Sequence, residues 1–557
     1  FTENGAVDLY HNNALKFATT ATGIDVTGIA VSDGMSTNTS GTSNFIAGVN
    51  AGNSIASGGV QNVCVGDEAG TAINTGDNNV AVGYAALDAN STGSQNVAIG
   101  TNALGVNTTA NNNVAVGYNA LDANLTGTQN VAVGFSALSS NTTANSNVAI
   151  GTNALAANTT GANNTAVGEN VMAANTEGVN NVALGYIALD ADTLGFQSTA
   201  LGYAALSAQN FTSSTPSQNV AVGYYAGVSV TTGVNNTLIG AHAGDALTDA
   251  DNNVAFGYQS LGADTLGSES TALGKGTLTA QNFTSATDTH NTAVGYQSGN
   301  DITVGVKNTL LGSRSGDALT DADENVGIGY ATLSGDTLGS KSVAVGSGAL
   351  EVQNFTSATD AYNTAVGYQS GNDITTGTRN TIMGSLGGDA LTEGGNNLVL
   401  GWNALGADTK GSRSVALGYS ALTTQNFTSA TNAYNVAVGF QAGNAVTTGL
   451  TNTLVGSLCH DNLTTGDLNV ALGYDTRPSA VGVDSEIVIG NSVTGAGTNT
   501  VRIGTAGGTA TLGLDGSDTS WAAASDSRLK KDVTDSTAGL EFINDLRPIT
   551  FKWNAKN

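Results

Sequence analysis

The chain alternates short apolar triplets with polar turns at a regular spacing. Segments such as Val80-Ala81-Val82 and Val97-Ala98-Ile99 are each preceded by Asn and followed by Gly. A few apolar residues enclosed between Asn and Gly are typical of a short β-strand bounded by turns. The pattern therefore predicts a long series of short strands, each followed by a turn, over about residues 44–505.

The strand motif repeats with a fixed period. The Gly that closes each motif recurs at a constant 17-residue interval from Gly66 to Gly202, after which one 21-residue step and three 17-residue steps alternate as far as Gly490. This second pattern adds a longer, 72-residue period from about residue 202. Such a unit is too short for two helices but suits one coil of a solenoid, whose strands stack about 4.8 Å apart. We therefore predict an all-β fold, a parallel β-solenoid of 17-residue coils.

The residues of each coil suit the stacking of identical positions. The Asn before each strand can form a ladder of side-chain amides, and the middle Ala suits an interior too narrow for larger side chains. The closing Gly supplies a positive φ or a close backbone approach at a corner. The stretch 84–87 is a candidate for a second short strand, and 88–93 is a turn cluster. Because one narrow coil buries little, we expect several chains to share the core, most simply three around an axis.

An aromatic residue often follows the motif Gly. Eleven of the 15 Tyr occupy this position, together with two Phe and one Trp. A ring that recurs at one position of many coils favours a packed seam over a ligand-binding stripe. The residues are Tyr84, Tyr118, Tyr186, Tyr203, Tyr224, Tyr258, Tyr296, Tyr330, Tyr368, Tyr419 and Tyr474, with Phe135, Phe440 and Trp402.

Composition and charge narrow the class of protein. The 557 residues include 75 Gly, only 3 Pro and 11% charged residues, which fits neither collagen nor a charged disordered chain. The net charge of −27 argues against nucleic acid or an anionic membrane as a partner. No run approaches 18 apolar residues, so we expect no membrane insertion. Two Cys cannot supply a disulfide framework for this length.

The sequence gives little support for a metal or cofactor site. It contains neither a Walker motif nor a dinucleotide fingerprint, and no paired carboxylates stand out from the repeat. Acidic turns recur at Asp245–Asp251, Asp317–Asp323 and Asp389–Glu393. Oxygen-rich turns can hold Ca²⁺, but this spacing is not that of an EF-hand loop, and we favour solvated turns. We expect no cofactor and no metal, and the His residues, which lack metal-ligand or triad spacing, are His11, His242, His290 and His460.

The four 21-residue steps insert a related loop with the sequence Gln-Asn-Phe-Thr-Ser. A Phe beside Asn, Gln and Thr suits sugar recognition, because it offers one stacking surface among hydrogen-bonding groups. The alternative, which we favour, is that each Phe tucks under its own loop or braces a neighbouring chain. The candidate binding residues are Phe211, Phe283, Phe355 and Phe427, with Asn210, Asn282, Asn354 and Asn426.

The strand motif resembles a known family of repeats. The Asn-Val-Ala-Val-Gly and Asn-Thr-Ala-Val-Gly units are similar to the repeats in the heads of YadA-type trimeric autotransporter adhesins, where Asn-Ser-Val-Ala-Ile-Gly recurs. The resemblance covers about residues 44–505 and implies a left-handed parallel β-roll assembled as a homotrimer. The family's repeat is shorter than the one in this chain, so the outer turn should be longer here.

Residues 1–43 follow a different pattern. Asn4-Gly5 and Asn12-Asn13 are turn signals between alternating apolar runs, which predicts β-hairpins and resembles the hairpin shaft segments of phage tail fibres. The sequence begins at Phe1, with neither an initiator Met nor a signal-peptide pattern. We therefore expect the chain to be internal to a longer polypeptide, whose preceding part contacts other tail or baseplate proteins.

The C-terminal segment also differs in composition. Six of the 16 basic residues lie in the last 30, which marks a boundary near residue 520 and leaves 506–524 as a connector. The segments 525–533 (SDSRLKKDV) and 540–553 (LEFINDLRPITFKW) resemble the N-terminal part of the intramolecular chaperone domain that follows phage tail spikes, tail fibres and endosialidases. In that family the domain trimerises, templates the folding of the upstream β-structure and cuts itself off. Slow, aggregation-prone β assembly explains the need for such a device.

The resemblance implies a self-cleavage site in residues 525–557. Ser525 would be the nucleophile that attacks its own carbonyl to give an ester, which then hydrolyses, and Asp526 would follow the broken bond. Lys530, after losing its proton, would be the base. The alternative from spacing alone is a solvated basic turn without chemistry.

Together these features predict a homotrimeric, extracellular β-solenoid fibre. The main interpretation is a phage tail fibre on the virion that binds a glycan or protein receptor on the host cell surface. The alternative is a bacterial trimeric surface adhesin or filament of the autotransporter type. In either case we expect no enzymatic activity on external substrates, only self-cleavage.

Overall fold

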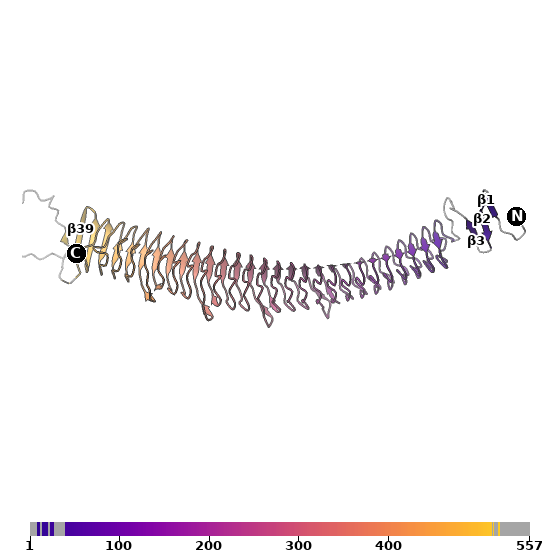
Figure 1. Ribbon diagram of the computed structural model, residues 1–557, viewed down its shortest axis with the longest axis horizontal. Coiled ribbons are helices and arrows are strands. Elements are labelled where there is room, and N and C mark those ends of the chain that lie inside the picture. Colours follow the sequence, from indigo (N-terminus) through magenta and orange to yellow (C-terminus); the bar gives the residue numbers. More distant parts are fainter. Residues whose placement is uncertain are drawn as a thin grey trace, which may run out of the picture. The chain divides into compact units, whose positions relative to one another are not determined.

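The computed structural model describes residues 8–11, 14–20, 23–26, 39–514, 516 and 522–523. They divide between two compact units, Phe1–Tyr362 and Asn363–Asn557. Within the described ranges the secondary structure is entirely β, so no helix there is long and apolar enough to cross a membrane. Within each unit the chain winds into successive coils (Figure 1).

The N-terminal strands of the first unit form an antiparallel sheet. They pair in the order β1-β2-β3, with Phe17 opposite both Leu9 and Val26. The strands are β1 (Asp8–His11), β2 (Ala14–Thr20) and β3 (Gly23–Val26).

The main sheet of the first unit is parallel and keeps one register. Val80 pairs with Val97, Ala81 with Ala98 and Val82 with Ile99, and later steps repeat this pairing. The result is the parallel β-solenoid with coils about 17 residues apart that the sequence predicts. The strands are β4 (Phe45–Ala47), β5 (Val63–Val65), β6 (Val80–Val82), β7 (Val97–Ile99), β8 (Val114–Val116), β9 (Val131–Val133), β10 (Val148–Ile150), β11 (Thr165–Val167), β12 (Val182–Leu184), β14 (Thr199–Leu201), β16 (Val220–Val222), β17 (Thr237–Ile239), β18 (Val254–Phe256), β20 (Thr271–Leu273), β22 (Thr292–Val294), β23 (Thr309–Leu311), β24 (Val326–Ile328) and β26 (Val343–Val345).

The second unit repeats this arrangement and ends in antiparallel pairs. Its strands pair in parallel as far as β38, after which β39 pairs with β38 and β40 with β39 in antiparallel fashion. The strands are β28 (Thr364–Val366), β29 (Thr381–Met383), β30 (Leu398–Leu400), β32 (Val415–Leu417), β34 (Val436–Val438), β35 (Thr453–Val455), β36 (Val470–Leu472), β37 (Ile487–Asn491), β38 (Thr500–Thr505), β39 (Gly508–Gly513) and β40 (Ala522–Ala523).

Each inserted loop is flanked by a two-stranded parallel sheet that the sequence analysis did not foresee. Gly195 pairs with Thr215 and Phe196 with Pro216, so the loop between them leaves the coil and returns in register. The pairs are β13 (Gly195–Phe196) with β15 (Thr215–Pro216), β19 (Gly267–Ser268) with β21 (Thr287–Asp288), β25 (Gly339–Ser340) with β27 (Thr359–Asp360), and β31 (Gly411–Ser412) with β33 (Thr431–Asn432).

The core of each coil is narrow. The middle strand residue points inward and is fully buried, as at Ala81 and Ala98, and a Leu from the following turn, such as Leu87, fills the remaining space. Residues 84–87 form a turn, so the candidate second strand in this stretch is wrong. Ala85 and Leu87 have φ values of 52° and 55°, which an extended strand cannot accommodate. The turn still bonds to the next coil, because Leu87 N–H donates to the Ala103 carbonyl at 3.0 Å.

The motif Gly is required by close stacking. Gly117 has a φ of 140°, and a Cβ at this position would lie less than 3.0 Å from the carbonyl oxygen of Gly134 in the next coil, closer than real Cβ atoms come. Both the backbone conformation and the contact therefore exclude a side chain.

The Asn ladder predicted from the sequence is present in the interior. Asn79 N–H donates to Asn62 Oδ1 at 3.0 Å, and the Asn79 side-chain amide donates to the Gly93 carbonyl at 2.9 Å. The same bonds recur at Asn96, whose N–H donates to Asn79 Oδ1. Because each amide links its own coil to its neighbour, the buried polar groups are satisfied along the stack.

Candidate functional site

The four Phe residues of the inserted loops lie inside the fold. Their exposed fractions are only 4–6%, and the Phe211 ring packs against Gly195 of the preceding coil. A buried ring offers no stacking face to a sugar, so this geometry favours the alternative in which each Phe tucks under its own loop. The neighbouring Asn210 is exposed, but its Oδ1 accepts a 3.0 Å hydrogen bond from the Thr193 hydroxyl, and Asn282, Asn354 and Asn426 do the same with Thr265, Thr337 and Thr409.

A buried Asp–Gln pair underlies each inserted loop. Gln209 Nε2 donates to Asp192 Oδ2 at 2.6 Å, and Gln209 Oε1 accepts from the Asn219 side chain at 2.8 Å. Asp192 also accepts from Gly195 N–H at 3.0 Å and from Phe211 N–H at 3.5 Å. The equivalent pairs are Asp264 with Gln281, Asp336 with Gln353, and Asp408 with Gln425.

Sequence reasoning missed these pairs, although a signal was present. The corresponding inner position is Asn in the coils from Asn90 to Asn175. It becomes Asp and then Gln once in every 72-residue period, and the other two coils of each period carry Val, Ile or Leu there. Burial raises the pKa of Asp192, Asp336 and Asp408, and the hydrogen bond from the paired Gln is the largest opposing contribution. The Asp–Gln pairs therefore anchor the inserted loops. Each pair buries a carboxylate with no cation beside it, which costs desolvation energy.

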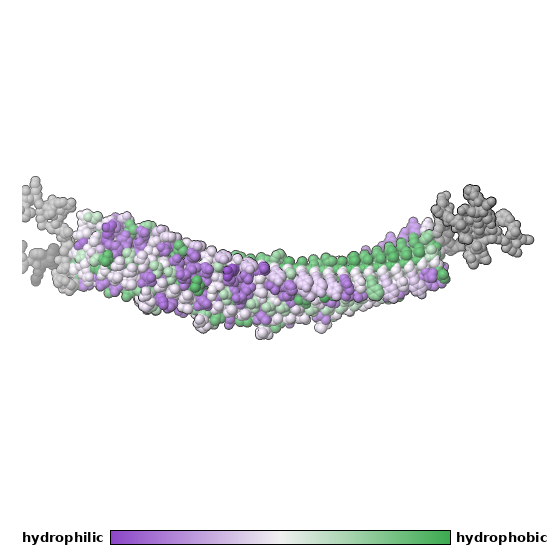
Figure 2. Space-filling model, viewed as in Figure 1, coloured by the Kyte–Doolittle hydropathy of each residue, from purple (hydrophilic) through white to green (hydrophobic). Residues whose placement is uncertain are grey.

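The outer face of the strands is apolar and exposed. The first and third residues of each strand point away from the core, and Ile99, Leu184 and Phe256 are 39–50% exposed. Apolar residues gather in a band along part of the first unit (Figure 2). Contiguous apolar faces of this kind are common where proteins contact partners.

The aromatic position is exposed and partly stacked within the chain. Tyr186, Tyr203 and Tyr224 form a continuous stack, with ring centroids 5.3–5.4 Å apart. Tyr118 stacks on Phe135 at 5.4 Å, and Tyr419 stacks between Trp402 and Phe440. Tyr84 and Tyr330 remain more than half exposed. The rings thus form short seams on the surface of a single chain.

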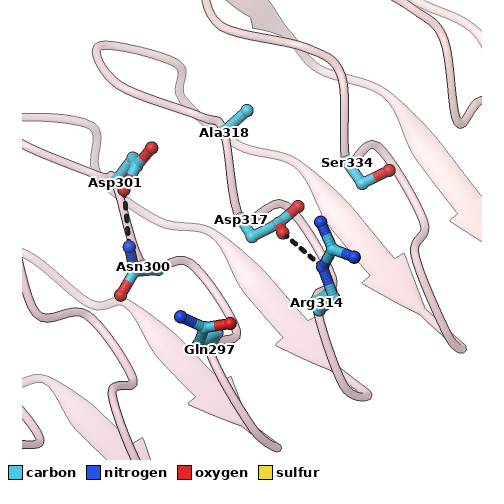
Figure 3. A pocket seen from close by; sticks show the side chains of 7 residues that line it. All are labelled: Gln297, Asn300, Asp301, Arg314, Asp317, Ala318 and Ser334. Atoms are coloured by element: carbon cyan, nitrogen blue, oxygen red, sulfur yellow. Dashed lines mark hydrogen bonds and ion pairs between the residues drawn. The ribbon is translucent and has the colours of Figure 1, made fainter.

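A polar hollow lies in the turns that follow β22, β23 and β24. Its volume is about 290 Å³. Arg314 Nε donates to Asp317 Oδ2 at 3.0 Å, and the Asn300 amide donates to Asp301 (Figure 3). Burial raises the pKa of Asp317, the Arg314 hydrogen bond opposes this, and the charge of Asp301 adds to the increase. The lining residues are Gln297, Asn300, Asp301, Arg314, Asp317, Ala318 and Ser334.

The His and Cys side chains that the structure describes differ in burial and in hydrogen-bond partners. His242 and His290 pair with Asp245 and Glu269, whereas His460 is fully buried and its Nε2 has no hydrogen-bond partner among the described residues. Burial lowers the pKa of His460 to about 4. The two Cys residues, Cys64 and Cys459, are free and buried, which raises the pKa of each thiol to about 11.

The acidic turns bond mainly within the solenoid. Asp251 Oδ1 accepts from Val234 N–H at 2.7 Å, and Asp323 Oδ1 accepts from Val306 N–H at 2.8 Å. Within the described ranges, no group of three or more His, Cys, Asp or Glu side chains could hold a metal ion.

The predicted self-cleavage residues Ser525, Asp526 and Lys530 lie outside the described residues. Residues 525–557 match the family model described as the chaperone of endosialidase, Peptidase_S74. No curated protein and no solved structure matched the chain. The chain therefore combines a parallel β-solenoid with a C-terminal segment similar to the endosialidase chaperone family.

Proposed function

We propose that the chain is the shaft and receptor-display part of a phage tail fibre. The observation that carries this proposal is the match of residues 525–557 to the endosialidase chaperone family, directly after a long β-solenoid. A narrow parallel solenoid is slow to nucleate, so a C-terminal folding device has a clear use. In this proposal Ser525 and Lys530 release the device by cleavage before Asp526 once the fibre has formed.

We further propose that the fibre is a homotrimer of left-handed β-rolls. The exposed apolar strand face supports this, because a face of this kind is unfavourable in water and the third strand residue is apolar in successive coils. Three copies can place identical faces around one axis and thicken the core that a single coil leaves thin. The segment before residue 44 would join other tail or baseplate proteins, and the turns would face the host receptor.

A bacterial trimeric surface adhesin is the second candidate. The similarity of the strand motif to YadA-type head repeats favours it. The two candidates differ in location: a tail fibre is found in purified virions, whereas an adhesin is found in the outer-membrane fraction of cells. Quantitative peptide mass spectrometry of both fractions separates them.

The test of the main proposal is the mass of the mature chain together with its oligomeric state. We expect the protein, expressed from its whole gene, to end at Ser525 and to run as a trimer that resists heat and detergent. An intact monomer would contradict both the cleavage and the assembly. A cleaved trimer found only in cell envelopes would support the adhesin instead.

A further inference from the structure

We propose that the polar hollow beside Arg314 and Asp317 binds one neutral pyranose unit of a surface polysaccharide. The inference deepens the proposed function and rests on it, because it gives host recognition a site. It also moves that site away from the inserted loops, whose Phe rings are buried.

The lining of the hollow suits hydroxyl groups. Six of the seven lining residues carry hydrogen-bonding side chains, and they come from three successive coils. Arg314 donates its Nε–H to Asp317. The rest of its planar guanidinium carries further N–H groups, which are hydrogen-bond donors. Asp301, Asp317 and Gln297 add acceptors. A sugar hydroxyl both donates and accepts, so adjacent hydroxyls can use such a mixed set.

The charge of the hollow disfavours an anionic ligand. One guanidinium faces two carboxylates, and the negative charge of Asp301 acts on Asp317. The chain as a whole carries −27. A uronic acid or another anionic sugar would therefore be repelled, and a purely apolar ligand would leave the polar lining without partners.

Exposed aromatic rings lie next to the hollow in the sequence and in space. Tyr296 precedes Gln297 and is 48% exposed. Tyr330, 56% exposed, contributes with Asp317 to raising the pKa of the Arg314 guanidinium. A ring beside convergent polar groups is a suitable arrangement for a sugar, whose C–H face packs on the ring while its hydroxyls bond.

The repeat itself shows that the Arg314 side chain is not needed for folding. Arg314 is replaced by Leu one and two 72-residue periods later, at Leu386 and Leu458, which have φ values of 55° and 54° against 57° for Arg314. Asp301 recurs as Asp373 one period later and is replaced by Ala at Ala445 after two periods. Arg314 therefore departs from the repeat at a position that tolerates an apolar residue, which points to a function other than stacking.

The experiment is saturation-transfer difference NMR on the mature protein. The neutral probes are the methyl glycosides of glucose, galactose and mannose, and the charged comparator is the anionic sugar glucuronic acid. We expect at least one neutral glycoside to bind, with a Kd on the order of 1 mM, and glucuronic acid to bind more weakly. Arg314→Leu should weaken binding at least about tenfold.

Two further variants keep the result interpretable. Lys307→Leu removes one exposed positive charge outside the hollow and should leave binding unchanged. Asp301→Ala, which copies Ala445, should weaken binding independently of Arg314. Unaltered melting temperatures will show that each variant is folded.

Several results would overturn the inference: no binding of any neutral glycoside, stronger binding of glucuronic acid, or equal binding by wild type and Arg314→Leu. The oligomeric state and C-terminal mass are measured on the same samples. A cleaved trimer that binds no sugar would contradict only the proposed sugar site. An uncleaved monomer that binds sugar would contradict only the fibre proposal.

Discussion

Gln209 holds the carboxylate of Asp192 by a 2.6 Å hydrogen bond across one coil, and both side chains are buried. The other end of the Gln209 amide accepts from Asn219 at 2.8 Å, so its orientation is fixed from both sides. The amide therefore joins the coil before the inserted loop to the coil after it.

Replacing Gln209 with Glu should destabilise the first unit by about 3 kcal/mol or more at pH 7. The change sets a second carboxylate against Asp192 and removes the donor, which leaves an uncompensated buried charge. Thermal melting followed by circular dichroism measures the loss. The matched control is Gln218→Glu, because Gln218 is exposed and its change should cost little. Equal melting temperatures for the two variants would show that the buried pair does not stabilise the loop.

Gly117→Ala should also cost about 3 kcal/mol or more. The new Cβ would overlap the Gly134 carbonyl, at a φ of 140° that Ala rarely adopts. Gly105→Ala is the control, since its φ is not positive and Ala156 occupies the equivalent position. Urea unfolding of both variants tests the difference. A Gly117→Ala protein as stable as the control would mean that the coils can separate locally at no cost.

The second unit should lose stability as pH falls from about 6.5 to about 4. His460 is buried with a pKa lowered to about 4, so over this window the unfolded chain binds a proton that the folded chain does not. The contribution of His460 is fully present above pH 6.5 and declines by up to about 3 kcal/mol at lower pH.

The variant His460→Asn removes this titration, and Asn tolerates the φ of 47° at this position. We expect its melting temperature to depend less on pH between 6.5 and 4 than that of the wild type. The raised pKa values of Asp389, Asp408 and Asp461 in the second unit act in the opposite sense, because protonation of a buried carboxyl favours the fold. The comparison between wild type and His460→Asn, rather than either curve alone, therefore decides.

Charges on the strand face should prevent self-association without unfolding the coils. In the double variant Val116→Lys, Val133→Lys two half-buried outward side chains of β8 and β9 become charged. Sedimentation equilibrium should then report a monomer. Thr109→Lys with Thr126→Lys adds the same charge on exposed turn residues and should leave the trimer intact. A trimer in both cases would place the contact between copies on another face.

Ser525→Ala should yield an uncut chain. In the proposed reaction the hydroxyl of Ser525 is the nucleophile, and Ala lacks it. Intact-mass spectrometry detects the retained residues 526–557. Ser520→Ala, the same substitution outside the matched family segment, should still be cut. Cleavage of the Ser525→Ala chain at the same bond would exclude this nucleophile.

The architecture could be predicted from the sequence because its causes are local and repeated. The spacing of Asn79, Ala81 and Gly83 recurs in every coil, and each residue makes the contact that its chemistry suggests: an amide ladder, a narrow interior and a corner with positive φ. The turn at 84–87 was harder to recognise. Ala85 and Leu87 adopt positive φ without being Gly, and their N–H groups donate to Asp67 in the preceding coil and Ala103 in the next coil, contacts that form only once the coils stack.

The candidate sites were less predictable, because they depend on which side chains meet across coils. Asp192 and Gln209 are 17 residues apart and meet only once the coils stack. The hollow at Arg314 likewise joins residues from three coils. Comparison of successive coils would have revealed the Asp–Gln pair, because Asn175 gives way to Asp192 and Gln209 at the same position. Comparison of positions one 72-residue period apart would have revealed Arg314, which becomes Leu386.

The unchanging register from Val80 to Val182 also bears on how the gene can vary. Loss or gain of one 17-residue unit in this stretch brings Ala onto Ala and Asn onto Asn again, so every contact keeps its kind. A length change within the strand motif turns the strand over or shifts the corner, so that inward Ala gives way to Val. The 21-residue steps avoid this because their extra residues lie in a loop and Ala200 still pairs with Ala221. Recombination between neighbouring repeats can therefore lengthen or shorten the protein in whole coils.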